Sequence, residues 1–150
     1  MIAVRVVFGS DHGGVALRRH LADIARELGH DVEEHGPADE STSVDYPDVA
    51  QTVCAAVLGA PDTVGVLVCG TGQGMAMAAN RIPGIRAAVL SDSFSAALAR
   101  AHNDANVLCL GGRVVGLGLG RVLLTTFLDA DFEGGRHARR VDKLTALERR

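Results

Sequence analysis

Residues 63–74 read Thr63-Val64-Gly65-Val66-Leu67-Val68-Cys69-Gly70-Thr71-Gly72-Gln73-Gly74, an apolar, β-branched run followed by alternating glycines. The apolar run is typical of a strand that is buried on both faces and ends at the cysteine. Because the glycines of the following loop carry no Cβ, several backbone N–H groups can approach one point. The pattern predicts a thiol at the edge of a sheet, beside fixed donors that can stabilise an oxyanion.

Strand and helix patterns alternate on both sides of this segment. Strands are predicted at residues 3–8, 30–34, 63–68, 85–90 and 107–110. Helices are predicted at residues 15–28, 47–58, 75–80, 93–101, 114–128 and 136–150. The second strand is partly polar, so we expect it near a sheet edge. Five strands interleaved with helices favour the α/β class, with a doubly wound parallel sheet.

The length and composition fit one globular domain spanning residues 1–150. The chain has 150 residues, of which 47% are apolar, and its formal net charge is −3. That charge gives no electrostatic reason to expect a nucleic acid as a partner. No apolar run reaches the roughly 18 residues of a membrane span, so no membrane partner is expected.

The three cysteines, Cys54, Cys69 and Cys109, are far apart in the chain. They show neither a disulfide framework nor a metal-binding spacing, and none of the six histidines falls in a zinc motif. We therefore expect a reducing, cytoplasmic location, in which Cys69 stays a thiol. Cys54 and Cys109 are interpreted as core residues, whereas for Cys69 a buried apolar role and a chemical role both remain open.

Polar residues follow several of the predicted strands at their carboxyl ends. Asp11 and His12 come after the first strand, and Cys69 and Thr71 come after the third. In a parallel sheet these ends share one edge, where ligands bind. His102 instead precedes the fifth strand and so falls at the opposite end. If His102 acts on the same substrate, it most simply comes from a second subunit.

The polar motifs also have alternative interpretations. The glycine loop could be a nucleotide cradle, a tight strand-to-helix turn, or a nest for an oxyanion or phosphate. It is not a GxGxxG motif, no P-loop lysine follows, and Asp92 is the acidic residue at ribose-clamp distance. Asp11 could cap the next helix, and His102 could belong to a helix C-terminal turn. Arg136 and Arg140, four residues apart, could bind phosphate or belong to a solvated basic tail.

Several short segments, spread in order along nearly the whole chain, together resemble one known family. These are residues 8–14 (FGSDHGG), 45–48 (DYPD), 69–74 (CGTGQG), 78–80 (AAN), 84–87 (GIRA), 102–106 (HNDAN), 112–115 (GRVV), 134–137 (GGRH) and 140–141 (RV). The family that they resemble is that of ribose-5-phosphate isomerase B, which includes galactose-6-phosphate isomerase subunits.

The resemblance implies a fold, a quaternary structure and a reaction. The implied fold is a Rossmann-like three-layer α/β/α sandwich with a five-stranded parallel sheet and a C-terminal helix. The implied assembly is a homodimer or a dimer of dimers, with active sites at the subunit interface. The implied reaction interconverts an aldose phosphate and a ketose phosphate, without a metal or an organic cofactor.

The resemblance also implies a role for each matching residue. Cys69 is the base that moves a proton between C1 and C2, and Thr71 assists at the oxygen atoms. His102, with Asp11 nearby, opens the sugar ring. The remaining substrate-binding residues are Gly70, Gly72, Gln73 and Gly74, whose loop holds the enediolate, Tyr46 and Asn103, which line the site, and His12, Arg113, Arg136 and Arg140, which grip the phosphate.

Two features of the matching segments bear on mechanism and substrate. Some family members replace the cysteine and use a glutamate just after the glycine loop, but this chain has Met75 there, so the cysteine mechanism is predicted. Gln73 lies within the loop, where its side chain could contact the substrate, so the motif does not decide which sugar is used. Ribose 5-phosphate is favoured over a four- or six-carbon sugar phosphate of the erythrose, erythrulose, allose or galactose type. The alternative from another class is a non-catalytic domain that binds a sugar phosphate or nucleotide.

Overall fold

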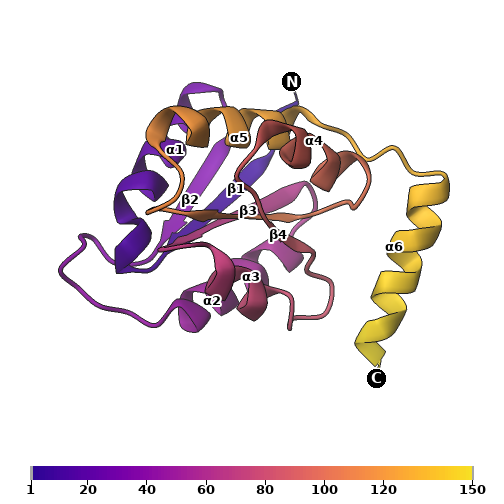
Figure 1. Cartoon of the computed structure of the whole chain (residues 1–150), viewed down its shortest axis with the longest axis horizontal. Helices are drawn as coiled ribbons and strands as arrows, with labels where there is room; N and C mark the ends of the chain where they lie inside the picture. The colour runs from indigo at the N-terminus through magenta and orange to yellow at the C-terminus, as the bar shows by residue number, and fades with distance from the viewer. Residues whose placement is uncertain (1, 150) are drawn as a thin grey trace.

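The computed structural model describes residues 2–149, and its centre is a sheet of five parallel strands in the order β2-β1-β3-β5-β4 (Figure 1). The strands are β1 (Arg5–Ser10), β2 (Asp31–His35), β3 (Thr63–Cys69), β4 (Ala87–Val89) and β5 (Val107–Gly111). Their carboxyl ends meet at one edge, on the left of Figure 1. The parallel sheet and the edge position of β2 confirm the sequence prediction.

Helices cover both faces of the sheet and give the expected three-layer α/β/α sandwich. They are α1 (Val15–Glu27), α2 (Tyr46–Leu58), α3 (Gln73–Ala79), α4 (Ser93–Ala101), α5 (Leu117–Asp129) and α6 (Arg136–Ala146). Helices α1, α4 and α5 lie on one face, and α2 and α3 lie on the other (Figure 1). None of the helices within residues 2–149 combines the length and the apolar character that crossing a bilayer requires.

The central strands supply side chains to two separate apolar cores. Val6 and Phe8 of β1 point to the core under α1 and α5, whereas Val7 points to the core over α2. Glycines let α2 approach the sheet closely, since a Cβ at Gly9 would lie only 2.5 Å from Val53 Cγ2. Small side chains and close backbone contact therefore build this core, in agreement with the scarcity of aromatic residues.

Some element boundaries differ from the sequence prediction. Helix α5 begins at Leu117 rather than at residue 114, because the N–H groups of Val114 and Val115 both bond to the Gly111 carbonyl and form a turn (3.0 and 2.8 Å). Helix α3 begins two residues earlier than predicted. Strand β4 has only three residues, because residues 82–85 form a turn closed by the Ile85 N–H on the Ile82 carbonyl.

Helix α6 stands apart from the rest of the molecule, at the right of Figure 1. It ends at Ala146 and continues as a 3₁₀ turn, η2 (Leu147–Arg149), while the last residue of the predicted helix lies outside the described part of the chain. The Gly84 N–H donates to Glu148 Oε1 (2.9 Å) and ties the end of this segment to the body. Leu144 and Leu147 remain about half exposed, at 49% and 50%. Apolar side chains at the end of α6 and in η2 are therefore only partly covered by this chain.

Candidate active site

Cys69 is the last residue of β3 and lies at the carboxyl edge of the sheet. Its strand neighbour is Gly111 of β5, and its side chain is 5% exposed. The Gly72 N–H donates to the Cys69 sulfur at 3.1 Å. The sulfur therefore faces the glycine loop, although the side chain also contacts the apolar core under α2 and α3. A backbone N–H aimed at the sulfur is a donor suited to a thiolate, which is the reactive form of cysteine.

The loop after β3 is shaped by its glycines and held by the loop after β5. Gly72 has φ +83°, and a Cβ there would lie 3.0 Å from the Leu110 carbonyl carbon. Gly112 N–H bonds to the Cys69 carbonyl (2.7 Å), and Arg113 N–H bonds to the Gly70 carbonyl (3.0 Å). An L side chain at position 72 would be both strained and crowded. Backbone hydrogen bonds from the loop after β5 thus fix the conformation of the glycine loop.

The N–H groups of the glycine loop have specific partners. That of Gly72 is directed at sulfur, and that of Gln73 donates to Thr71 Oγ1 at 3.3 Å. The loop also passes directly into α3, whose N-cap is Gly72. The sequence pattern predicted a nest of donors for a substrate oxygen; in this structure the Gly72 N–H is directed at the thiol, and the nest stays a prediction.

The loop after β1 meets the glycine loop. Asp11 is buried and its Oδ1 accepts the Gly13 N–H (2.9 Å), so this carboxylate caps the short 3₁₀ turn η1 (His12–Gly14). A Cβ at Gly13 would lie 3.5 Å from the Gly70 nitrogen, which shows how close the two loops are. His12 is oriented by the Val44 N–H, which approaches its Nδ1 at 3.4 Å. Asp11 and His12 therefore share one edge of the sheet with Cys69, as predicted.

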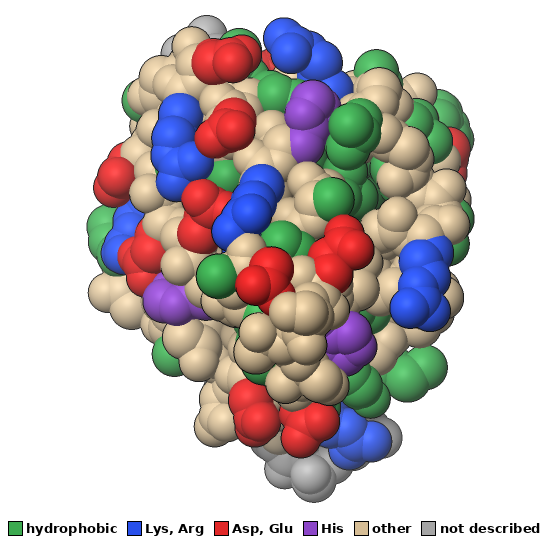
Figure 2. Space-filling view, turned by 90° about the vertical axis from the view of Figure 1, so that its left-hand side faces the viewer, with side chains coloured by type: hydrophobic (Ala, Val, Ile, Leu, Met, Phe, Trp, Pro, Cys, Tyr) green, Lys and Arg blue, Asp and Glu red, His purple; other side chains and the backbone are tan. Residues whose placement is uncertain are grey.

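Tyr46 and Arg113 complete this group from two further elements. Tyr46 is the first residue of α2, and its ring covers Gly74 so closely that a Cβ there would lie 2.6 Å from Tyr46 Cε1. The Arg113 side chain passes Gly70 at about van der Waals distance. We call this group the glycine-loop half-site; it comprises Asp11, His12, Tyr46, residues 69–74 and Arg113. Figure 2 views the molecule from this edge, where acidic, basic and histidine side chains are interspersed.

The other predicted site residues lie elsewhere in the chain. His102 is the C-cap residue that follows α4, and it precedes β5, so it is near the amino edge of the sheet. Asn103 lines a groove of about 470 Å³ between the β4 side of the body and the end of α6. Arg136 and Arg140 are exposed on α6, which stands away from the sheet (Figure 1). One chain therefore brings together part of the predicted site and leaves His102, Asn103 and both arginines apart from it.

His102 has two neighbours that the sequence analysis missed. Its imidazole stacks on that of His137, with ring centroids 4.0 Å apart and an interplanar angle of 9°. Glu133 Oε1 lies 3.6 Å from His102 Nε2 and 3.7 Å from His137 Nε2. We call these three residues the histidine cluster. The i,i+4 spacing of Glu133 and His137 was the available sequence signal, but it does not reveal their contact with His102.

The histidine cluster is also the group of described residues whose donor atoms could hold a metal ion, since all lie within 4.8 Å of one another. Zinc–nitrogen bonds of about 2.0–2.1 Å require the lone pairs of both imidazoles to converge on one point. In parallel stacked rings these lone pairs run side by side instead. Burial, the charge of His102 and then that of Arg136 lower the pKa of His137. The arrangement is that of a stacked pair next to a carboxylate and does not resemble a preformed metal site.

The three cysteines differ in their surroundings. Burial raises the pKa of Cys54 to about 11, and burial raises that of Cys109 further. Both side chains are fully buried, as predicted for core residues. Cys69 differs from them because a loop N–H reaches its sulfur.

Asp92 has a structural role in this chain. Its carboxylate accepts the Ser95 N–H (2.7 Å) and caps α4, which weakens the interpretation of Asp92 as a ribose clamp.

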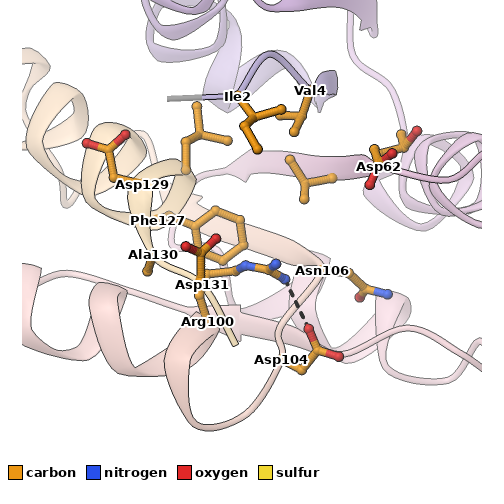
Figure 3. Close-up of a pocket in the computed structure, with 13 residues that line it drawn as sticks. Ile2, Val4, Asp62, Arg100, Asp104, Asn106, Phe127, Asp129, Ala130 and Asp131 are labelled. Atoms are coloured by element: carbon orange, nitrogen blue, oxygen red, sulfur yellow. Dashed lines mark hydrogen bonds and ion pairs between the residues drawn. The ribbon is translucent and has the colours of Figure 1, made fainter. Parts of the chain in front are cut away.

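A cavity of about 1010 Å³ lies at the opposite, amino edge of the sheet (Figure 3). Its wall includes Asp62, Asn106 and Phe127. Arg100 lies over the Phe127 ring at 5.7 Å and pairs with Asp104 at 3.4 Å. None of the predicted site residues is among its described lining residues. The reactive side chains of the predicted site therefore do not line this cavity.

The geometry agrees with comparisons to known proteins. A family model described as Ribose/Galactose Isomerase matches residues 6–144. Ribose-5-phosphate isomerase B of Escherichia coli (strain K12) is 44% identical to this chain, and the match covers 97% of both sequences. D-erythrulose-4-phosphate isomerase of Pectobacterium atrosepticum is 37% identical, with 95% of this chain and 94% of that protein covered.

Solved structures are similar to this chain in both fold and sequence. Ribose-5-phosphate isomerase B of Clostridium thermocellum has a TM-score of 0.94 and 46% identity, and covers 97% of this chain and 98% of its own. The enzyme of Mycoplasma genitalium with bound ribulose-5-phosphate has a TM-score of 0.93 and 37% identity, with 99% of each chain covered. The chain therefore belongs to the Ribose/Galactose Isomerase family and is a sugar-phosphate isomerase.

Proposed function

We propose that this isomerase interconverts ribose 5-phosphate and ribulose 5-phosphate through an enediolate, with Cys69 as the base. The observation that carries the proposal is the Gly72 N–H on the Cys69 sulfur, at the edge where three loops meet. The names of similar proteins, including the ribose-5-phosphate isomerases B of Escherichia coli and Clostridium thermocellum, favour this pentose phosphate.

In the proposed proton transfer, the Cys69 thiolate takes the proton from C2 of the open-chain aldose. The electron pair of that C–H bond forms the C1–C2 double bond of the enediolate, and negative charge collects on O1. A proton then passes from O2 to O1, with Thr71 near both oxygens, and the thiol returns its proton to C1. Fixed backbone donors stabilise such charge without reorganising, and loss of one typically costs about 3 kcal/mol.

The phosphate and the ring-opening group require a second copy of the chain in this proposal. Within one copy, the glycine-loop half-site contains His12 and Arg113 as phosphate ligands, whereas Arg136, Arg140 and His102 lie elsewhere. Large apolar side chains are exposed on the same chain, including Phe94 (74%) and Met77 (68%). Exposed apolar surface of this kind is suited to a protein interface. We therefore expect a homodimer, or a dimer of dimers, in which each active site draws residues from two subunits.

A four-carbon sugar phosphate is the second candidate substrate. The similar protein from Pectobacterium atrosepticum is a D-erythrulose-4-phosphate isomerase, so closely related sequences differ in the sugar that they use. The exposed Gln73 in the glycine loop is placed to affect the length of sugar that fits. The catalytic residues would be unchanged, and the distance from Cys69 to the phosphate ligands would differ.

The substrate proposal is tested by kcat/KM for four-, five- and six-carbon aldose phosphates. We expect the five-carbon substrate to have the largest value, and a larger value for the four-carbon sugar would contradict the assignment. In D₂O, the same reaction is expected to place deuterium at C1 of the ketose product, because the thiol proton can exchange with solvent. A product without deuterium would instead favour direct hydride transfer and would contradict the enediolate.

A further inference from the structure

The backbone around His102 is held by several hydrogen bonds, but its imidazole projects from the end of a helix. The His102 N–H bonds to the Leu98 carbonyl (2.8 Å), and the Ala105 N–H bonds to the Ala99 carbonyl (2.9 Å). The side chain itself is one-third exposed. A ring at such a position can rotate about its side-chain torsions unless neighbours restrict it. General acid–base catalysis needs a fixed imidazole, so the side-chain neighbours of His102 matter.

His137 restricts the plane of the His102 ring. The two rings are nearly parallel, at 9°, and their centroids are 4.0 Å apart. His137 lies in the first turn of α6 and is buried, so it forms the more rigid member of the pair. The pKa of His137 is lowered by burial and then by the charge of His102, which favours the neutral ring at pH 7. A neutral ring can stack on His102 when His102 carries a proton, without the repulsion of a second cation.

Glu133 is fixed next to both rings. Its backbone N–H bonds to the carbonyl of Ala101, the residue before His102, at 2.9 Å. Its Oε1 faces His102 Nε2 at 3.6 Å. At 3.6 Å this is an ion-pair distance and not a hydrogen bond; a carboxylate there stabilises the imidazolium, and it selects the tautomer once it closes to hydrogen-bonding distance. This leaves Nδ1 of His102 for the substrate.

We infer that Glu133 and His137 are positioning residues for His102, which hold its imidazole in the orientation and tautomer needed to open the sugar ring. The inference rests on the proposed function, in which His102 performs that step. In ring opening, His102 takes the proton of the C1 hydroxyl, and the electron pair of that O–H bond forms the C1 carbonyl. The bond from C1 to the ring oxygen O4 breaks, and the imidazolium returns the proton to O4. The carboxylate of Glu133 stabilises the imidazolium while it exists.

Two reactions separate this role from a general structural one: isomerisation of ribose 5-phosphate and exchange of the C1 hydrogen of ribulose 5-phosphate. Ribose 5-phosphate is mostly cyclic and must be opened, whereas ribulose 5-phosphate cannot form a five-membered ring because its O5 carries the phosphate. We therefore expect Glu133→Gln and His137→Ala to lower kcat/KM for ribose 5-phosphate by about 10- to 100-fold, the range typical of carboxylate partners of histidines. Exchange of the C1 hydrogen of ribulose 5-phosphate with solvent should stay within about twofold of the unmodified protein, because that step needs no ring opening.

Matched variants make the test specific. His137→Phe keeps a flat ring on His102, so we expect it to retain more ring-opening activity than His137→Ala; equal losses would overturn the role of stacking. Asp131→Asn removes an exposed carboxylate two positions from Glu133 and should change neither reaction. The positioning inference is wrong if Glu133→Gln and His137→Ala lower the isomerisation of ribose 5-phosphate and the C1 hydrogen exchange of ribulose 5-phosphate equally. It is also wrong if they lower neither while His102→Ala selectively impairs ribose 5-phosphate, in which case the proposed function survives. If His102→Ala itself shows no such selectivity, the ring-opening role in the proposed function fails as well.

Discussion

The glycine-loop half-site and the histidine cluster are held together by different forces. The half-site lies where three strands end, and backbone hydrogen bonds link its loops, such as Gly112 N–H to the Cys69 carbonyl. The histidine cluster joins the end of α4 to the start of α6 through a ring stack, one carboxylate and one backbone hydrogen bond. Cys69 and Asp11 of the first are buried, whereas Glu133 of the second is 57% exposed. In the proposed mechanism, proton transfer at carbon is therefore supported by backbone hydrogen bonds, and ring opening depends on side-chain contacts.

The largest expected effect concerns the half-site. Replacing Cys69 by Ala removes the base, and we expect kcat for isomerisation to fall by about 1000-fold, within the usual contribution of general bases. The dissociation constant of inorganic phosphate, measured by calorimetry, should change little. Cys54→Ala, at a buried thiol of the same core, is the control and should keep its activity. Full activity in Cys69→Ala would exclude this residue as the base.

Arg136 and Arg140 lie on α6, the helix that carries His137 of the histidine cluster, and they test whether this helix contributes to phosphate binding. Arg136→Ala and Arg140→Ala should each raise KM by about 10-fold, the equivalent of one charge-assisted contact. They should lower kcat less, because they bind a group remote from the reacting carbons. Arg139→Ala changes an exposed arginine on the same helix and should leave KM unchanged. An equal rise in KM for all three variants would mean that α6 supplies only general positive charge.

Stability measurements compare tightly packed and open glycines. A Cβ at Gly14, beside the half-site, would lie 2.5 Å from the Val68 carbonyl oxygen, so Gly14→Ala should reduce the free energy of unfolding by about 1–3 kcal/mol. Gly118 in α5 has open space around it, and Gly118→Ala should add up to about 1 kcal/mol. Urea unfolding measures both changes. The same sign for both would contradict the packing described for this edge.

The smallest effect concerns the pH dependence of the histidine cluster. Because the pKa of His137 is lowered in the folded protein, the unfolded chain binds this proton more tightly. The contribution of His137 to the free energy of unfolding is present above the ordinary histidine pKa of about 6.5. This contribution is lost as the pH falls below that value. The drop in Tm between pH 7.5 and pH 5.5 should therefore be smaller in His137→Phe than in the unmodified protein. Identical drops in Tm would show that folding does not lower the pKa of His137.

The sequence predicts local features better than contacts between distant segments. The run from Thr63 to Gly74 contains its own strand, thiol and flexible turn, and the structure has all three in place. The start of α5 was wrong because Val114 and Val115 continue an apolar helical pattern, although their N–H groups form a turn on Gly111. The contact of His102 with His137 depends on the path of residues 130–135 back to α4. No local pattern specifies that path.

The shared-site proposal makes the most direct prediction about these two regions. A heterodimer can be purified with a different affinity tag on each chain, one chain carrying Cys69→Ala and the other His102→Ala. If each site takes its thiol from one subunit and its His102 from the partner, one of the two sites is intact, and about half of the unmodified activity on ribose 5-phosphate should return. If the heterodimer is as inactive as either parent homodimer, each site draws both groups from a single chain and the account is contradicted.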